Sequence, residues 1–274
     1  MLYVGTAGFS YSDWRGVFYP EGMKSSDFLR FYSERFPCVE LDFTYYRQPV
    51  PQTMRVMASK VPASFKFTVK AHRTLTHEIP LENHLTYEFE TFRQGVLPMG
   101  ESGKLGCILF QFPWSFKPSS RNSDYVLSLA DRVAYADVVV EFRNNLWAKD
   151  EIYGLLRQNG IGFCCVDEPA LKGLFPPVSL VTSKLGYLRF HGRNASKWFK
   201  HKEAWERYDY LYNNEELNHW LPQIQQMAGQ SQDMYVLFNN CHQGQAAVNA
   251  KQMQELLGLL PEIRPFPEHG LFSE

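Results

Sequence analysis

The chain has 274 residues, of which 45% are hydrophobic and 15% aromatic, and its formal net charge is −1. This length and composition provide for a sizeable core and are typical of a single α/β barrel domain covering residues 1–274. The small net charge excludes a general attraction to nucleic acid or acidic lipid, so any affinity for anions has to be local. The five cysteines form neither a CxxC pair nor a zinc pattern, which indicates reduced and mostly buried thiols.

The N-terminal residues Leu2-Tyr3-Val4 already have the character of a strand, with no basic segment or long apolar run around them. A secretory leader or a membrane-spanning helix requires such a run. The sequence therefore predicts a cytoplasmic protein without membrane association, and it carries no signal for an oligomeric state.

Eight short runs rich in β-branched and aromatic residues predict eight strands. They cover residues 2–6, 39–43, 65–70, 107–112, 138–142, 161–166, 187–191 and 234–238. Apolar residues at helical spacing predict helices in most of the intervening segments, at residues 28–36, 52–60, 82–93, 126–133, 152–156, 217–227 and 246–257. Residues 170–184 contain Pro176-Pro177 and have no such spacing, so the helix after the sixth strand is expected to be irregular or missing.

Strand and helix alternate over the whole length, which predicts a parallel sheet with right-handed crossovers. About eight such units in a chain of this length favour closure of the sheet into a (β/α)8, or TIM, barrel over an open sheet.

In an α/β barrel, the C-terminal ends of the strands and the loops after them form the active site. Nearly all of the predicted strands end in polar or ionisable residues. Because side chains alternate along a strand, one set of these residues is expected to face the interior near the mouth of the barrel. The set consists of Glu40, Lys70, Gln111, Glu141, Asp167, Arg189, His191 and Asn239, and Arg193 is expected on the same face as Arg189 and His191.

Charged groups inside a barrel must be paired or used, because burying an isolated charge costs several kcal/mol. One interpretation is a purely structural network in which the carboxylates neutralise the lysine and the arginines. The number of polar strand ends exceeds what strand register requires, and this favours a functional site.

Two kinds of ligand are compatible with these residues. Carboxylates and an imidazole suit a divalent metal, and the candidate ligands are Glu40, Asp42, Glu141, Asp167 and His191. Lys70, Arg189 and Arg193 would repel a cation, whereas arginine holds a phosphate or carboxylate with two parallel hydrogen bonds. An anionic ligand is therefore favoured over a metal, and the cofactor is unknown.

Two loops add aromatic residues. The segment 8–20 follows the first strand and includes Tyr11 and Trp14, which we interpret as part of a lid and as candidate substrate contacts. The segments 198–202 and 208–212 interleave basic and aromatic residues. Such a pattern occurs in proteins that bind nucleic acid, but also in solvated loops with an aromatic anchor, so nucleic acid stays an alternative partner.

Motifs along essentially the whole chain resemble one known family. They are Val4-Gly5-Thr6-Ala7-Gly8-Phe9, Trp14, Gly16, Phe18-Tyr19-Pro20, Glu40, Thr44-Tyr45-Tyr46-Arg47-Gln48-Pro49, Phe65-Lys66-Phe67, Lys70, Thr76-His77, Gln111-Phe112-Pro113, Glu141-Phe142-Arg143, Trp147, Asp167, Arg189-Phe190-His191-Gly192-Arg193, Tyr208, Tyr210, Phe238-Asn239-Asn240 and Asn249-Ala250. Together they resemble the YecE-like proteins, also called domain of unknown function 72. The resemblance implies a TIM barrel and no established activity, and the likeness of such barrels to metal-dependent sugar isomerases and apurinic-site endonucleases concerns the fold alone.

Two positions depart from the pattern of that family. The family usually has Glu-x-Asn where this chain has Glu40-Leu41-Asp42, and usually histidine where this chain has Asn144. The first departure adds a carboxylate, and the second removes an imidazole.

These observations predict an enzyme, a hydrolase or an isomerase, that acts on a phosphorylated or otherwise acidic substrate. The acid–base groups are expected to be Glu40, Glu141, Asp167 and His191, and the substrate-binding residues Lys70, Gln111, Arg143, Arg189, Arg193, Asn239, Tyr11 and Trp14. The alternatives are a nucleic-acid or nucleotide-binding protein and a metal-dependent phosphodiesterase of the endonuclease type.

Overall fold

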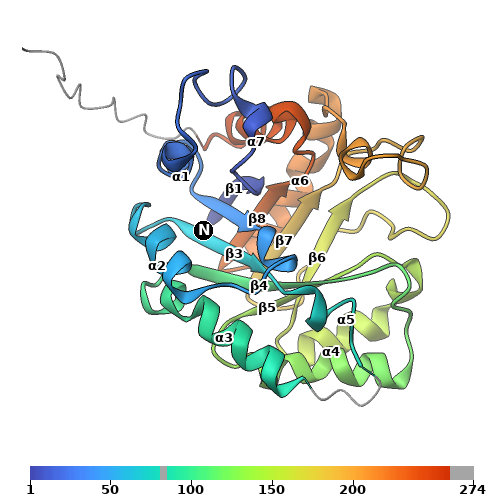
Figure 1. Ribbon diagram of the computed structural model, residues 1–274. Helices are drawn as coiled ribbons and strands as arrows, with labels where there is room; N and C mark the ends of the chain where they lie inside the picture. Colours follow the sequence, from blue (N-terminus) through green and yellow to red (C-terminus); the bar gives the residue numbers. More distant parts are fainter. Residues whose placement is uncertain (81–84, 260–274) are drawn as a thin grey trace, which may run out of the picture.

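The computed structural model describes residues 1–80 and 85–259, and its strands form a closed parallel barrel in sequence order (Figure 1). The strands are β1 (Leu2–Ala7), β2 (Cys38–Leu41), β3 (Lys66–Lys70), β4 (Leu105–Phe112), β5 (Val138–Phe142), β6 (Gly162–Asp167), β7 (Leu185–Phe190) and β8 (Asp233–Phe238). All eight predicted strands and the TIM-barrel fold are confirmed, and each strand begins and ends within two residues of its predicted bounds.

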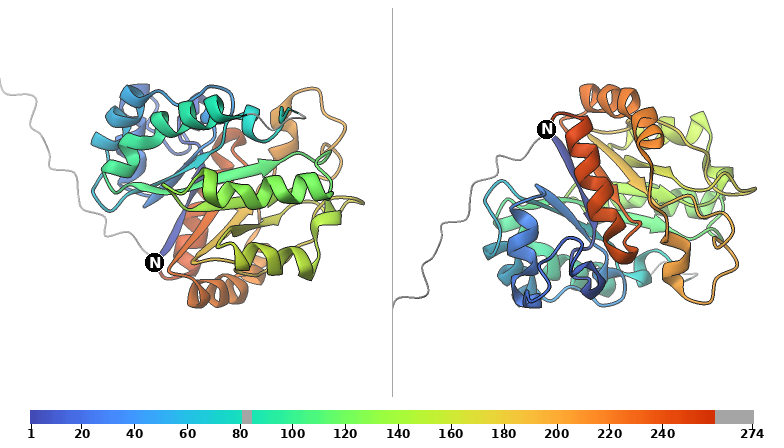
Figure 2. Two further views of the ribbon diagram at one scale, coloured as in Figure 1. Left: turned by 90° about the horizontal axis from the view of Figure 1, so that it is seen from below. Right: turned by 90° about the horizontal axis from the view of Figure 1, so that it is seen from above.

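The α-helices lie outside the barrel (Figure 2). They are α1 (Phe28–Ser33), α2 (Pro51–Ser59), α3 (Thr86–Glu101), α4 (Ser120–Arg132), α5 (Asp150–Gln158), α6 (Asn214–Gln230) and α7 (Gln245–Leu256). The segment between β6 and β7 contains no α-helix, as predicted from its prolines. None of the helices in the described ranges combines the length and apolar character needed to cross a bilayer.

Helix α3 differs most from its prediction. It continues to Glu101, past the predicted end at residue 93, although it contains Gly95 and Pro98. The start of the predicted helix, residues 82–84, lies outside the described residues. A Cβ at Gly95 would lie 2.3 Å from the carbonyl oxygen of Pro49, so the glycine allows α3 to pack closely on the segment before α2. Burial of the apolar face of α3 therefore outweighs the low helix propensity of glycine.

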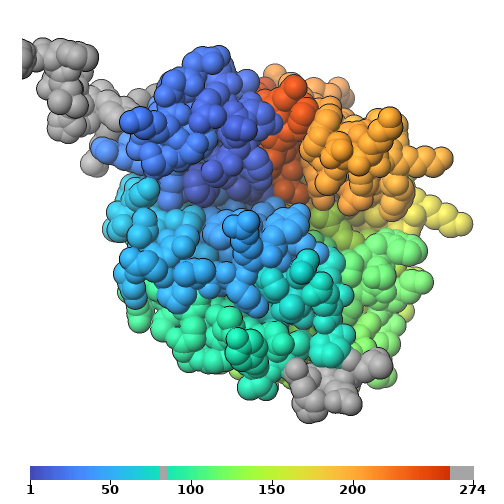
Figure 3. All heavy atoms as spheres, in the orientation of Figure 1, coloured from blue at the N-terminus to red at the C-terminus, as the bar shows by residue number. Residues whose placement is uncertain are grey.

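Because the strands of the barrel are parallel, the loops that follow them gather at one end. The residues after β2 and those after β7 share one face of the molecule (Figure 3). Strand β2 ends at Leu41, two residues earlier than predicted, because residues Phe43–Tyr45 form a turn of 3-10 helix. The Thr44 hydroxyl donates to the backbone carbonyls of Leu41 (2.7 Å) and Lys70 (2.6 Å), which fixes this turn against β3.

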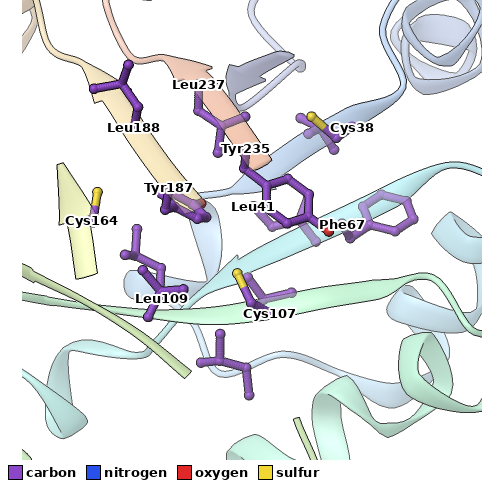
Figure 4. Close-up of a cluster of buried hydrophobic side chains, with 14 of the residues drawn as sticks. Cys38, Leu41, Phe67, Cys107, Leu109, Cys164, Tyr187, Leu188, Tyr235 and Leu237 are labelled. Atoms are coloured by element: carbon purple, nitrogen blue, oxygen red, sulfur yellow. The ribbon is translucent and has the colours of Figure 1, made fainter. Parts of the chain in front are cut away.

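The interior of the barrel changes from apolar to polar along its axis. Cys38, Phe67, Cys107 and Tyr235 belong to the buried cluster shown in Figure 4. Tyr187 lies in the same cluster, and its hydroxyl donates to Glu40 Oε2 at 2.6 Å. Tyr187 therefore joins the apolar part of the interior to the charged part at the mouth.

The close packing of α3 leads to a prediction about stability. We expect Gly95→Ala to lower the free energy of unfolding by about 1–3 kcal/mol, because the added methyl group forces α3 and the Pro49 segment apart. Gly100→Ala is the matched control in the same helix, since its Cβ would meet nothing within 4 Å. The control should leave stability unchanged or raise it by up to ~1 kcal/mol. Urea denaturation measures both, and equal stability of the two variants would contradict this account of the packing.

Candidate functional site

Arg189 occupies the centre of the barrel below its mouth. It projects from β7 and is completely buried, with 0% of its surface exposed. Its guanidinium donates to Glu141 Oε2 of β5 at 2.7 Å and to Glu40 Oε1 of β2 at 2.5 Å. A buried cation held by two carboxylates connects three strands that are not neighbours in the barrel and meets the requirement that buried charges be paired.

Arg143 forms a second layer closer to the mouth. Its Nε lies 2.5 Å from Glu141 Oε1, and its NH1 donates to Glu168 Oε2 at 2.8 Å. The other oxygen of Glu168 accepts from the backbone N–H of Phe175 at 3.1 Å, which fixes the carboxylate. Glu141 is therefore shared between the two arginines.

His191 is buried and neutral. Its Nδ1 accepts from Asn239 Nδ2 at 3.0 Å, so the ring proton belongs on Nε2, which lies 3.4 Å from Glu141 Oε1. Burial, reinforced by the positive charge of Arg143, lowers the pKa of His191 to about 3. At neutral pH the imidazole is therefore a neutral hydrogen-bonding group.

Lys70 and Asp42 form a looser pair at the ends of β3 and β2. Lys70 Nζ lies 3.6 Å from Asp42 Oδ1, and Arg189 NH2 is also 3.6 Å from that oxygen. Burial opposes ionisation of Asp42, but the two cations keep its pKa below the usual value. Lys70 Nζ also lies 4.8 Å from the ring centroid of Tyr45, a cation–π contact.

The buried carboxylates differ in their proton affinity. Burial raises the pKa of Glu40 to about 7 despite Arg189, and that of Glu168 to about 7 despite Arg143. Burial acts in the same direction on Glu141, but Arg143 and Arg189 together hold its pKa well below the usual range. Two carboxyl groups are thus set to exchange protons near neutral pH, while Glu141 stays ionised.

A cavity of about 310 Å³ opens above these layers. It is lined by Tyr45, Tyr46, Lys70, His77, Gln111, Pro113, Trp114, Arg143, Leu174, Trp198, Phe199, Arg207 and Tyr208. Lys70, Arg143 and Arg207 are the charged residues of this lining, since burial and the nearby cations lower the pKa of His77 to about 4. The cavity wall therefore presents cations and aromatic rings, and the carboxylates lie behind them.

Some buried polar atoms beneath the cavity have unused hydrogen-bonding capacity. Within the described residues, Arg189 Nε and Asp42 Oδ1 are buried and make no hydrogen bond, and His191 Nε2 has only the long contact of 3.4 Å with Glu141 Oε1. Because buried polar groups are normally satisfied, these atoms mark the layer beneath the cavity as incompletely hydrogen-bonded.

Most of the residues predicted from the strand ends come together at the mouth. They are Glu40, Lys70, Gln111, Glu141, Arg143, Arg189, His191 and Asn239.

Asp167 does not face the interior, and the expectation that it does is wrong. It pairs in register with Phe190, and it accepts hydrogen bonds from Trp220 Nε1 of α6 and from the Tyr212 hydroxyl, both at 2.7 Å. Its neighbour Val166 pairs with Arg189 and takes the inward position. Asp167 therefore anchors α6 to the outside of the barrel.

Arg193 also lies away from the mouth, contrary to expectation. It holds Asp167 with two hydrogen bonds of 2.8 and 2.6 Å. The reason is Gly192, whose φ of 85° breaks the alternation of β7 and turns the chain outward.

Tyr11 and Trp14 have structural contacts and do not line the cavity. Trp14 is fully buried, and its indole N–H donates to the carbonyl of Cys241 at 2.7 Å. The Tyr11 hydroxyl donates to the carbonyl of Ala7 at 2.9 Å. The segment 8–20 thus packs on the barrel between β1 and α7, as the lid interpretation predicts, but its two aromatic residues have no contact with the cavity.

The residues proposed as an alternative metal site do not form one. Glu40 and Glu141 direct their oxygens to Arg189, and Asp167 directs its oxygens to Arg193 and α6. Across residues 1–80 and 85–259, no group of three or more His, Cys, Asp and Glu side chains is arranged to hold a metal ion.

The prediction missed Glu168 and the aromatic wall of the cavity. Glu168 follows β6 directly and, counted from Val166, has inward parity. Tyr45, Tyr46 and His77 lie in family-like motifs, but these motifs do not indicate a chemical role for them. Asn144, where the family usually has histidine, is buried and donates through Nδ2 to the carbonyl of Trp114 at 2.8 Å, which joins the loops after β4 and β5.

Comparison with known proteins confirms the resemblance. Residues 3–270 match the family described as "Protein of unknown function DUF72". The UPF0759 protein YunF of Bacillus subtilis (strain 168) is 33% identical over 273 residues, which cover 94% of this chain and 95% of YunF.

Solved structures agree with this assignment. A DUF72 family protein from Thermotoga maritima MSB8 is 44% identical with a TM-score of 0.88, over 94% of this chain and 99% of that one. A DUF72 family protein from Enterococcus faecalis V583 is 27% identical with a TM-score of 0.85, over 94% and 96% of the two chains. A D-psicose 3-epimerase, solved in the presence of D-fructose, is 9% identical with a TM-score of 0.50, over 86% and 95%, and at this identity shares only the fold. The motifs, the barrel and these relatives together show that the chain belongs to the DUF72 family.

Proposed function

We propose that this protein is an enzyme, a hydrolase or isomerase, that binds an anionic substrate at the C-terminal mouth of its barrel. The substrate carries a phosphate or carboxylate group. The observation that carries the proposal is the separation of charge around the cavity: Lys70, Arg143 and Arg207 line it, and the carboxylates Glu141 and Glu168 lie behind Arg143. In such an arrangement the carboxylates fix the cations in place and leave donor groups facing the ligand.

Arg207 contributes most to the attraction of an anion. It makes no ion pair with a carboxylate of the described residues, whereas Lys70 is paired with Asp42, and Arg143 with both Glu141 and Glu168. Its Nε donates to the carbonyl of Trp198 at 2.9 Å, and its guanidinium lies 5.5 Å from the Trp198 ring centroid. These contacts orient the group without neutralising its charge.

Glu168 is the group best suited to transfer a proton in this proposal. Its pKa of about 7 matches the requirement that a general acid or base be near neutrality, and it contacts Arg143 on the cavity wall. Glu40 has a similar pKa but lies deeper, beneath Arg189. Glu141 and His191 keep one protonation state around neutral pH, so we assign them the positioning of Arg143 and Arg189. Asp167, on the outer face, has no role in this proposal.

The first test measures binding of sulfate, a dianion of constant charge near neutral pH. We expect Arg207→Gln to weaken sulfate binding about ten-fold or more, because a hydrogen bond to a charged group contributes roughly 1.5–3 kcal/mol. Isothermal titration calorimetry gives the affinity. Arg157→Gln is the control, since it removes the same charge from an exposed position on α5, outside the cavity. Equal affinities of the Arg207 variant and the wild type, or no sulfate binding by the wild type, would contradict the proposal.

The second test concerns pH. Between about pH 8 and pH 6 the carboxyl group of Glu168 takes up a proton, since its pKa is about 7. Protonation removes a negative charge beside Arg143, so sulfate should bind several-fold more tightly at the lower pH. In Glu168→Gln the affinity for sulfate should depend less on pH, because Glu40 is then the one remaining carboxyl group of the site with a pKa near 7. Calorimetric titrations at both pH values check this, and an unchanged pH dependence in the variant would refute the role of Glu168.

A further inference from the structure

Three large aromatic side chains around the mouth are exposed to solvent. Tyr46, Trp114 and Phe199 have exposed fractions of 70%, 46% and 59%. They belong to the loops after β2, β4 and β7, and all three line the cavity. Rings from three separate loops therefore surround one cation-lined opening.

Exposure at this level means that the three rings contribute little to the core. Single exposed apolar residues are common, but a group of them around a cavity is a mark of a binding site. Other aromatic residues of the same lining, such as Trp198, are buried and serve packing. The exposed group is thus distinct from the rings that hold the loops together.

Two of the exposed rings are held in position before any ligand binds. The indole N–H of Trp114 donates to the carbonyl of Gly173 at 2.9 Å. The Tyr46 ring packs edge to face on Tyr45 at 4.9 Å, and Tyr45 in turn contacts Lys70. Tyr46 is therefore linked through Tyr45 to a cation of the cavity. Because Tyr46 and Trp114 are already held in place, they lose little conformational freedom when a ligand binds.

The size of the cavity indicates how much of a ligand it can hold. A volume of about 310 Å³ is at the lower end of the range for small-molecule sites, roughly 300–1,000 Å³. It has room for an anionic group together with a small ring attached to it. Because Tyr46, Trp114 and Phe199 line the same cavity as the cations, such a ring would lie beside the exposed aromatic side chains.

We propose that the anionic group of the substrate is carried by a ring, and that the face of this ring contacts Tyr46, Trp114 and Phe199. The inference rests on the proposed function and defines its substrate class as ring-bearing organic phosphates or carboxylates. An aromatic ring and a sugar ring both offer a flat apolar face to tyrosine, tryptophan and phenylalanine.

The experiment compares three phosphate esters by calorimetry at about pH 8, where each is a dianion. Methyl phosphate carries no ring, phenyl phosphate carries an aromatic ring, and α-D-glucose 1-phosphate carries a sugar ring. We expect at least one of the two ring-bearing esters to bind roughly ten-fold more tightly than methyl phosphate, as stacking on aromatic side chains provides. The ester that gains affinity identifies the kind of ring.

Variants test which side chains provide the higher affinity for a ring-bearing ester over methyl phosphate. In the double variant Tyr46→Ala/Phe199→Ala, only Trp114 remains of the three rings, so the gain in affinity should fall from roughly ten-fold to about two-fold, while the affinity for methyl phosphate stays the same. Tyr87→Ala is the control, because Tyr87 is 79% exposed and does not line the cavity. Circular dichroism confirms that the variants are folded.

The outcomes separate the two proposals. If all three esters bind the wild type with equal affinity, or if the gain in affinity is undiminished in the double variant, the ring inference is overturned and anion binding stands. If neither these esters nor sulfate binds, the proposed function fails, and the ring inference fails with it.

Discussion

The pairing of buried Arg189 with Glu40 and Glu141 is the constraint on which the mouth of this barrel depends. A guanidinium in the barrel interior is tolerated only if carboxylates neutralise it, since burying an unpaired charge costs several kcal/mol. Glu40 and Glu141 come from β2 and β5, and Arg189 comes from β7. The three side chains therefore fix the relative positions of strands that are far apart in the sequence.

The position of Arg143, closer to the mouth, depends on the pairing of Arg189. Glu141 has one oxygen on Arg189 and the other on Arg143, and Glu168 holds Arg143 from its other side. Arg143 is thereby kept at the cavity wall next to Lys70 and Arg207. Charge alternates along the barrel axis towards the mouth, and the layer that faces the cavity is positive. This order accounts for the local positive charge on which the proposed anion site depends, in a chain with a net charge of −1.

The sequence predicts the barrel well because hydrophobic runs and helical spacing are local signals. It also predicts most of the mouth, since Glu40, Lys70, Glu141 and Arg189 lie on strands whose alternation sets their direction. It fails at β6, where Asp167 was expected inside the barrel. This strand is apolar on both faces, so its composition does not show which of its side chains face the interior of the barrel. Only its pairing with β7 shows that Val166 faces inward.

Other features depend on contacts between loops and have no local signal. The turn at Gly192 removes Arg193 from the mouth, because one residue with positive φ ends the alternation of β7. The aromatic wall is assembled from loops that follow different strands, and its members meet only after the barrel closes. The family motifs mark some of these residues, such as Tyr46 and His77, but motifs alone do not tell which rings are exposed.

The most direct test of the central claim is a crystal structure determined with selenate, whose selenium atom is located by anomalous scattering. The account predicts an oxyanion in the cavity, within hydrogen-bonding distance of Arg143, Arg207 and Lys70, with Arg189 still paired to Glu40 and Glu141. Selenate bound at other sites, while the mouth holds no anion at saturating concentration, would contradict it.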